Sequence, residues 1–234
     1  MSAVDLSKPS VPSTSTSIGQ KLLNIFVSPC DVFEEVVIAR LTVANWLVPT
    51  LLVCIAGLIL LRAAAINEPT ASVIGQVVEA GAVSAPPAEK LPGGSETISW
   101  ATVCLGAIAG TFWSAFVLWF IGRVFLKTRF SFLKTVEVVG LTGIILVLGT
   151  IVTALLIAAS GNPAARPALS LLTGGLDISN PIGAALDAMN LFHLWTTTVL
   201  AVGLSKLSGV SFKESAFWVF GYWLSARIAL ILLA

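Results

Sequence analysis

The sequence predicts an all-α membrane protein: a polytopic helical bundle with five transmembrane helices, preceded by short amphipathic interfacial helices. The first reason is composition, because 56% of the 234 residues are hydrophobic and 11% are charged, whereas soluble domains carry about a quarter charged residues. The second is a series of long apolar runs of about 20 residues, the length that crosses a bilayer. The third is the gathering of basic residues in alternate connecting segments, as cytoplasmic loops require.

The connecting segment 123–134 sets the predicted orientation. It contains Arg123, Lys127, Arg129 and Lys134 and no acidic residue. Short loops rich in lysine and arginine stay on the cytoplasmic side, so this segment is expected inside. The remaining segments then alternate, which places Lys8, Lys21, Arg40, Arg123, Lys127, Arg129, Lys134, Lys206 and Lys213 inside, and only Arg62, Lys90 and Arg166 outside. We therefore expect a cytoplasmic N-terminus and a C-terminus outside.

Residues 1–17 are expected to form a disordered cytoplasmic tail, because they are rich in serine, threonine and proline and lack the apolar core of a secretory signal. Residues 18–234 then form a single five-span membrane domain. It opens with two short amphipathic helices joined at Ser28 and Pro29, since an N-cap serine followed by proline starts a helix. These helices either lie on the inner leaflet or pack beneath the bundle, and the sequence leaves both alternatives open.

The first two spans are predicted at about residues 44–65 and 98–122. Trp100 and Trp119 lie near the two ends of the second span, as expected of aromatic residues that prefer the membrane interface. Between the spans lies an insertion, residues 66–97, which contains several prolines and glycines and more acidic than basic residues. This composition places the insertion outside the membrane.

The last three spans are predicted at about residues 135–160, 186–205 and 214–234. The Gly-Asn-Pro sequence after residue 160 is a strong stop signal for the first of them. Lys206 and Lys213, between the last two, bring the chain back to the cytoplasmic side. The final span of about 20 residues reaches about 30 Å, which is just enough to cross the hydrocarbon core.

A stripe of small residues marks the second predicted span. Thr102, Gly106, Gly110 and Ser114 recur every four residues and so lie on one helix face. Small residues let a second helix approach closely in a membrane. We expect this stripe to be buried against a neighbouring helix of the same chain, with a homodimer seam as the alternative.

A polar face marks the fourth predicted span. Asp187, Asn190, His193 and Thr197 fall within about a third of the helix circumference. Because polar groups are costly in lipid, this face should look into the bundle. Arg227, the only basic residue inside a span, is predicted to pair with Asp187, with Asn190 as a candidate third member. The cluster is interpreted as an interhelical polar clamp, and a proton or substrate path is the alternative.

The sequence contains no pattern for catalysis or for a cofactor. One histidine and three widely spaced cysteines do not form a zinc or haem site of usual composition. A nucleophile elbow, a phosphate loop and a dinucleotide fingerprint are all missing. We therefore expect no enzyme activity, no cofactor and no metal. The net charge of +1 is too small to create an electrostatic field that would attract nucleic acid.

Several segments together resemble the bacterial branch of the YIP (Ypt-interacting protein) domain family. They are SPCDVFEEVV ahead of NWLVP, the inner-loop run FSFLKTVEVVG, and NLFHLWTTTVLAVGLSKLSGVSFKESAFWV. The positions that match the family pattern are Ser28, Pro29, Phe33, Trp46, Pro49, Phe192, Trp195, Gly203 and Leu204. The resemblance covers roughly residues 18–232 and implies five membrane helices with a cytoplasmic N-terminus.

The resemblance also bears on partners. Eukaryotic members of the family act in vesicle traffic between the endoplasmic reticulum and the Golgi and contact small Rab GTPases. The chain lacks the Asp-Leu-Tyr-Gly-Pro signature that those members carry near the first span. This departure weighs against binding of a small GTPase.

The expected function is that of a non-enzymatic membrane scaffold or adaptor, whose interfacial helices and basic loop meet membrane lipid, a protein partner or a second copy of the chain. The alternative is a small transporter or channel subunit that uses the polar face of the fourth span. The alanine-rich composition and the missing eukaryotic signature favour a bacterial inner membrane.

Overall fold

The computed structural model describes residues 16–65, 96–162, 165–169, 186 and 189–233. The described residues form seven helices and no strand, which confirms the predicted all-α class. The helices are α1 (Ile18–Val27), α2 (Pro29–Ile38), α3 (Ala44–Ala65), α5 (Glu96–Val124), α6 (Phe132–Ser160), α8 (Leu191–Ser208) and α9 (Phe212–Leu233). The predicted tail, except for Thr16 and Ser17, and nearly all of the predicted insertion lie outside the described residues.

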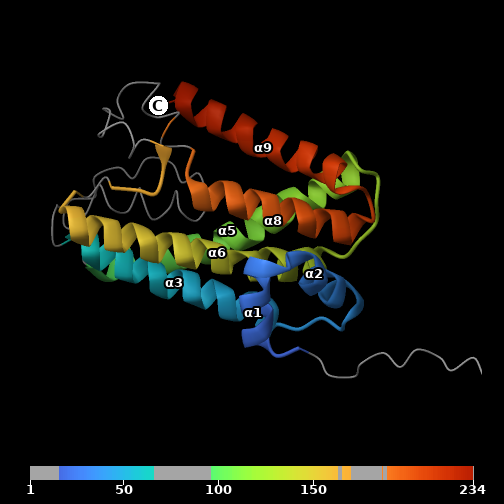
Figure 1. The fold of residues 1–234 in the computed structure, drawn as a ribbon, viewed down its shortest axis with the longest axis horizontal. Helices are drawn as coiled ribbons and strands as arrows, with labels where there is room; N and C mark the ends of the chain where they lie inside the picture. The colour runs from blue at the N-terminus through green and yellow to red at the C-terminus, as the bar shows by residue number, and fades with distance from the viewer. Residues whose placement is uncertain (1–15, 66–95, 163–164, 170–185, 187–188, 234) are drawn as a thin grey trace, which may run out of the picture.

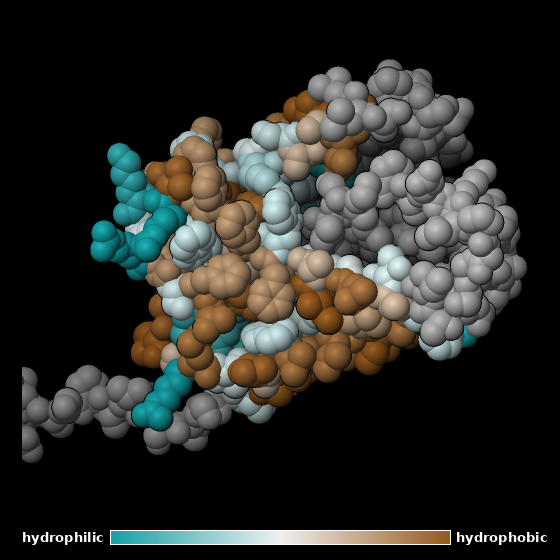
Figure 2. Space-filling view, turned by 180° about the vertical axis from the view of Figure 1, so that it is seen from behind, coloured by the Kyte–Doolittle hydropathy of each residue, from teal (hydrophilic) through white to brown (hydrophobic). Residues whose placement is uncertain are grey.

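The five long helices run in alternating directions, and α1 and α2 cover one end of them (Figure 1). Helix α6 is central, since it packs against α3, α5 and α8. The C-terminal end of α9 lies at the end opposite α1 and α2 (Figure 1). Figure 2 shows hydrophilic residues gathered at one end and hydrophobic residues along the flank. This distribution suits a bundle whose sides contact lipid.

Three described helices are long and apolar enough to cross a membrane: α3, α5 and α6. Helices α8 and α9 are not among these candidates, which were sought in the described residues alone. Helix α8 carries His193 and Lys206, and α9 carries Lys213, Glu214 and Arg227. The chain is thus a helical membrane protein with three candidate spans in its described part, and crossing by α8 and α9 stays a prediction.

The N-terminal helices pack beneath the bundle, which was one of the two alternatives left open by the sequence. Ile25, Phe33 and Val36 are fully buried and form one core with Val138 and Leu141 of α6. The opposite side of the pair keeps apolar side chains exposed: Leu23 at 69%, Val27 at 85% and Ile38 at 87%. We call α1 and α2 together the cap.

Local residues define where the cap helices begin. Ser17 caps α1, because its side chain accepts from the backbone N–H of Gln20 while the Gln20 side chain accepts from the Ser17 backbone N–H. Helix α2 begins at Pro29 directly after Ser28, as predicted. The Ser28 side chain makes no capping bond, so the proline, with φ already helical and no N–H to satisfy, is what favours this start.

Glycines on α6 and α8 permit close helix contacts. A Cβ atom on Gly140 would overlap the backbone of Trp46 on α3, and one on Gly203 would overlap the Val138 side chain on α6. On α5, a Cβ on Gly106 would meet no atom within 4 Å. Close approach of helices through glycine therefore occurs between α3 and α6 and between α6 and α8.

Candidate functional site

A cavity of about 130 Å³ lies among the five long helices and is partly open. Its wall is mostly apolar, with glycine, alanine, valine and leucine residues from α3, α5, α6 and α8. Polar residues that line it include Thr50, Ser114, His193, Thr197 and Arg227. No carboxylate is found among the described residues of the wall.

His193 and Arg227 meet at this cavity. The Nη2 atom of Arg227 lies 2.7 Å from Nδ1 of His193. A guanidinium nitrogen can only donate, so Nδ1 must accept, and the neutral ring then carries its proton on Nε2. The contact joins α8 to α9 and brings a fixed positive charge to the cavity.

The threonine hydroxyls of the wall are used within their own helices. Thr50 donates to the Trp46 carbonyl at 2.7 Å, and Thr197 donates to the His193 carbonyl at 2.8 Å. Thr111, Thr142 and Thr196 make the same kind of bond to the residue four positions earlier. Each hydroxyl has a single proton, so these groups have none left to donate into the cavity.

The predicted polar cluster is brought together only in part. His193 contacts Arg227, and the Thr197 hydroxyl bonds the His193 carbonyl. Asn190 does not lie on the helix face, because α8 begins at Leu191 and the Asn190 side chain instead caps it by accepting from the Phe192 N–H at 2.9 Å. Asp187 lies outside the described residues, so its pairing with Arg227 stays a prediction.

The predicted packing stripe has mixed surroundings. Gly110 and Ser114 line the cavity, and Thr102 is half-buried. Gly106 has open space where a side chain would be. Between α5 and α3, the hydroxyls of Thr111 and Thr50 lie 3.3 Å apart. A homodimer seam along the stripe stays a prediction.

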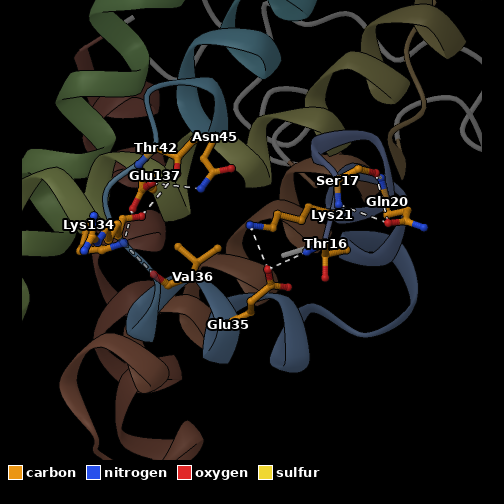
Figure 3. Close-up of polar contacts among 11 residues, drawn as sticks. Thr16, Ser17, Gln20, Lys21, Glu35, Val36, Thr42, Asn45, Lys134 and Glu137 are labelled. Atoms are coloured by element: carbon orange, nitrogen blue, oxygen red, sulfur yellow. Dashed lines mark hydrogen bonds and ion pairs between the residues drawn. The ribbon is translucent and has the colours of Figure 1, made fainter. Parts of the chain in front are cut away.

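A second polar site, absent from the sequence-based predictions, fixes the cap to the bundle. Glu137 on α6 is 1% exposed, and its Oε1 accepts from the Thr42 N–H at 2.6 Å and from Nδ2 of Asn45 at 3.0 Å. Its Oε2 lies 2.7 Å from the ammonium group of Lys134, which also donates to the Val36 carbonyl at 2.7 Å (Figure 3). We call Thr42, Asn45, Lys134, Glu137 and the Val36 carbonyl the buried junction.

The buried junction joins three elements. It connects the end of α2, the connection to α3 and the start of α6 (Figure 3). Charged groups away from water need several partners, and Glu137 has them. The sequence indicated only that Glu137 lies near Lys134, because its other partners come from 92 and 95 positions away. A lone acid at the start of a long apolar run was the only available signal.

Two further ion pairs involve the cap: one joins its two helices to each other, and the other joins the cap to α8. Nζ of Lys21 on α1 lies 3.2 Å from Oε1 of Glu35 on α2, which also accepts from the Thr16 N–H at 3.2 Å. Burial of Glu35 acts to raise the pKa of its carboxyl, but the hydrogen bond from Thr16 and the ion pair with Lys21 outweigh burial and lower that pKa. The second pair is more exposed to solvent and joins Lys206 of α8 to Glu34 of α2.

The fold and these sites define a class: a helical membrane protein with a cap fixed to one end and a small cavity inside, and with no recognisable catalytic group among the residues described. The family model of the Yip1 domain matches residues 23–234. The chain therefore belongs to the Yip1 domain family, as its sequence motifs indicated. Comparison with curated proteins and with solved structures gave no match.

Proposed function

We propose that this chain is a non-enzymatic scaffold or adaptor of a bacterial cytoplasmic membrane, and that the cap is its docking surface. One observation carries the proposal: the cap is fixed to the bundle by the buried junction and by the ion pair of Glu34 with Lys206, while Leu23, Val27 and Ile38 of the cap are exposed. A surface held rigidly before binding loses little conformational entropy when a partner docks.

The proposal includes five membrane spans, with the cap on the cytoplasmic side and the C-terminus outside. The alternating directions of the five long helices support it (Figure 1). Helix α8 packs against α2, α6 and α9, so its polar residues can face protein. A helix in such surroundings need not be as apolar as a helix that faces lipid. Arg40 lies just after α2, and Lys127 and Arg129 lie in the connection between α5 and α6, which agrees with a cytoplasmic location of these segments.

The docking role can be tested by photocross-linking in native membranes. A photoreactive amino acid is placed at Val27 or at Ile38, the most exposed apolar positions of the cap, and at Leu155 of α6 as a matched control. Leu155 is 63% exposed on the flank of the bundle and should contact lipid only. We expect one protein to be captured from both cap positions and none from Leu155. Capture of lipid alone at all three positions would contradict the adaptor role.

The cavity favours a second candidate function, a small transporter or channel subunit. His193 lines the cavity and contacts Arg227, so an ionisable ring lies beside a space within the bundle. The test is proton flux into liposomes that contain the purified protein. A transport path through this face would lose its flux in His193→Phe, whereas a scaffold would show no flux above empty liposomes with either chain.

A further inference from the structure

We infer that an exposed surface where α5 runs into its connection to α6 binds an anionic phospholipid. The surface combines three exposed aromatic side chains with three exposed basic side chains. The aromatic row is Phe116, Phe120 and Phe125, and the basic cluster is Arg123, Lys127 and Arg129. Neither part belongs to the cap, so the inference does not rest on the adaptor role.

The aromatic row follows α5 to its C-terminal end. The ring centroids of Phe116 and Phe120 lie 6.2 Å apart, and those of Phe120 and Phe125 lie 6.3 Å apart. Phe125 then stacks on Trp218 of α9 at 4.2 Å, and Figure 1 shows this connection beside the start of α9. All three side chains of the row remain between 43% and 45% exposed. A continuous row of exposed rings on the flank of a membrane bundle suits contact with acyl chains near the interface.

The basic cluster is displayed by an ordered connection. The backbone N–H of Thr128 donates to the Gly122 carbonyl at 3.0 Å, which returns the chain onto the last turn of α5. The ring of Phe130 packs so closely over Gly122 that a Cβ atom there would overlap it. Leu126 is buried in the same core as Trp218. Because this backbone is fixed before binding, less conformational entropy is lost when a ligand is bound.

The backbone of Lys127 supports a role for its side chain. Leu126 and Phe130 pack into the core, while Phe125, Lys127 and Arg129 are exposed. Lys127 has a φ angle of 54°, a left-handed conformation that glycine or asparagine adopts more readily than lysine. The local backbone therefore gives no reason for a lysine at this position, whereas a function for its charge does.

The charges of the basic cluster are not neutralised within the part of the chain that the structure describes. Its three members form no ion pair with another described residue. The guanidinium of Arg123 lies 5.8 Å from the ring centroid of Trp119, a contact that leaves its positive charge in place. At the start of α9, Lys213 and Glu214 are both exposed and offset each other. The surface therefore attracts an anion.

The order of the two parts favours a phospholipid over a soluble anion. Acyl chains need an apolar surface and a phosphate needs donors, and the aromatic row leads along α5 to the basic cluster at the helix end. Arginine and lysine bind phosphate oxygens through charge-assisted hydrogen bonds. Basic clusters at the cytoplasmic ends of membrane helices attract anionic lipids. A soluble phosphate would make no use of the aromatic row.

The test is native mass spectrometry of the purified full chain, freed of lipid in an uncharged detergent and titrated with short-chain lipids. The anionic probe is dioctanoyl phosphatidylglycerol, and dioctanoyl phosphatidylcholine is the control without net charge. Glycerol phosphate is the soluble head group. We expect phosphatidylglycerol adducts at lower concentrations than phosphatidylcholine adducts, and no adduct with glycerol phosphate at the same concentrations.

Three variants separate charge from apolar contact. Arg129→Gln should weaken binding of phosphatidylglycerol about fivefold, the change expected for one basic residue near an anionic lipid. Lys206→Gln, the matched control, removes the same charge from a lysine that already pairs with Glu34, so binding should stay unchanged. Phe120→Ala should weaken binding of both lipids equally and leave the ratio of their affinities unchanged.

Several results would overturn the inference. They are equal affinity for the two lipids, unchanged binding in Arg129→Gln, an equal loss in Lys206→Gln, or binding of glycerol phosphate as tight as that of phosphatidylglycerol. If Arg129→Gln does not fold, Lys127→Gln makes the same comparison at another exposed position of the connection. Because the assay contains no partner protein, a negative result leaves the adaptor proposal intact, and a failed cap cross-link leaves the lipid site intact.

Discussion

Gly140 sets the distance between α3 and α6. A Cβ atom there would overlap the Trp46 backbone, which cannot move aside as a flexible side chain can. Three positions later on the same helix, a Cβ on Gly143 would lie 3.7 Å from a methyl group of Val53, an ordinary contact. Two glycines of one helix therefore have different roles: the first is required for packing and the second is not.

We predict that Gly140→Ala destabilises the folded protein by about 1–3 kcal/mol or more, the usual range for overpacking in a well-packed core. Gly143→Ala is the matched control and should unfold at nearly the temperature of the unmodified chain. Thermal unfolding of both variants in detergent, followed by size-exclusion chromatography, makes the comparison. Equal unfolding temperatures for the two variants would show that α3 and α6 do not approach as described.

Glu137 and Lys134 form the charged pair of the buried junction. Removing one member leaves a buried charge without its partner, so Glu137→Gln is expected to cost about 3 kcal/mol. The double variant Lys134→Met with Glu137→Gln should lose less stability than the two single losses added together, as measured by a double-mutant cycle. Additive losses would contradict a direct pair.

The matched control for this cycle is the pair Glu34 and Lys206. Its side chains are 57% and 28% exposed, compared with 2% for Glu137 and 13% for Lys134. Solvent screens exposed pairs, so Glu34→Gln with Lys206→Met should show a much smaller coupling.

At the scale of elements, a carboxyl with a lowered pKa joins the two helices of the cap. Glu35 links α2 to α1 through Lys21 and Thr16, and its pKa is lowered below the ordinary value of 4.5. A carboxyl with a lowered pKa in the folded state stabilises that state above the ordinary pKa. The stabilisation is lost as the pH falls below 4.5 and through the lowered pKa.

We predict that α1 detaches from α2 more readily in acid. Amide hydrogen exchange of the peptide containing α1, corrected for the intrinsic pH dependence of exchange, should rise below pH 4.5 in the unmodified chain. Glu35→Gln should remove this step, whereas Asp31→Asn, at an exposed acid of the same helix, should keep it. A step that persists in Glu35→Gln would assign the pH dependence to another group.

Elements were more predictable than contacts. Long apolar runs indicated α3, α5 and α6 because length and hydropathy are local properties. The predicted start of α8 was wrong by several residues, since the spacing places Asn190 on a continuous helical face, whereas its side chain caps the helix. The close contacts at Gly140 and Gly203 were not predicted, because spacing shows that small residues share a face but not which face meets a neighbour.

The candidate sites show the same division between local and distant information. The spacing placed His193 and Thr197 on one face of the fourth predicted span, and Arg227 was the only basic residue inside a predicted span. In the structure, Nη2 of Arg227 lies 2.7 Å from Nδ1 of His193. The buried junction was not predictable, because Glu137 is satisfied by residues more than 90 positions away. The cavity likewise depends on how five helices pack and has no sequence motif.

At the scale of the whole molecule, the adaptor role requires the cap to face the cytoplasm, and the five-span proposal places the C-terminus on the other side. Two cysteines can report this arrangement. Cys30 in the cap is exposed, and Ala234→Cys adds a thiol at the C-terminus. Replacing Cys54 and Cys104 with alanine removes the other thiols of the chain.

The most direct measurement is labelling of these two thiols with a membrane-impermeant maleimide, in intact spheroplasts and after permeabilisation. Five spans with a cytoplasmic cap predict that the Ala234→Cys thiol is labelled in intact spheroplasts and that Cys30 is labelled only after permeabilisation. Labelling of Cys30 from outside would contradict the orientation. Protection of both thiols until permeabilisation would contradict an odd number of spans.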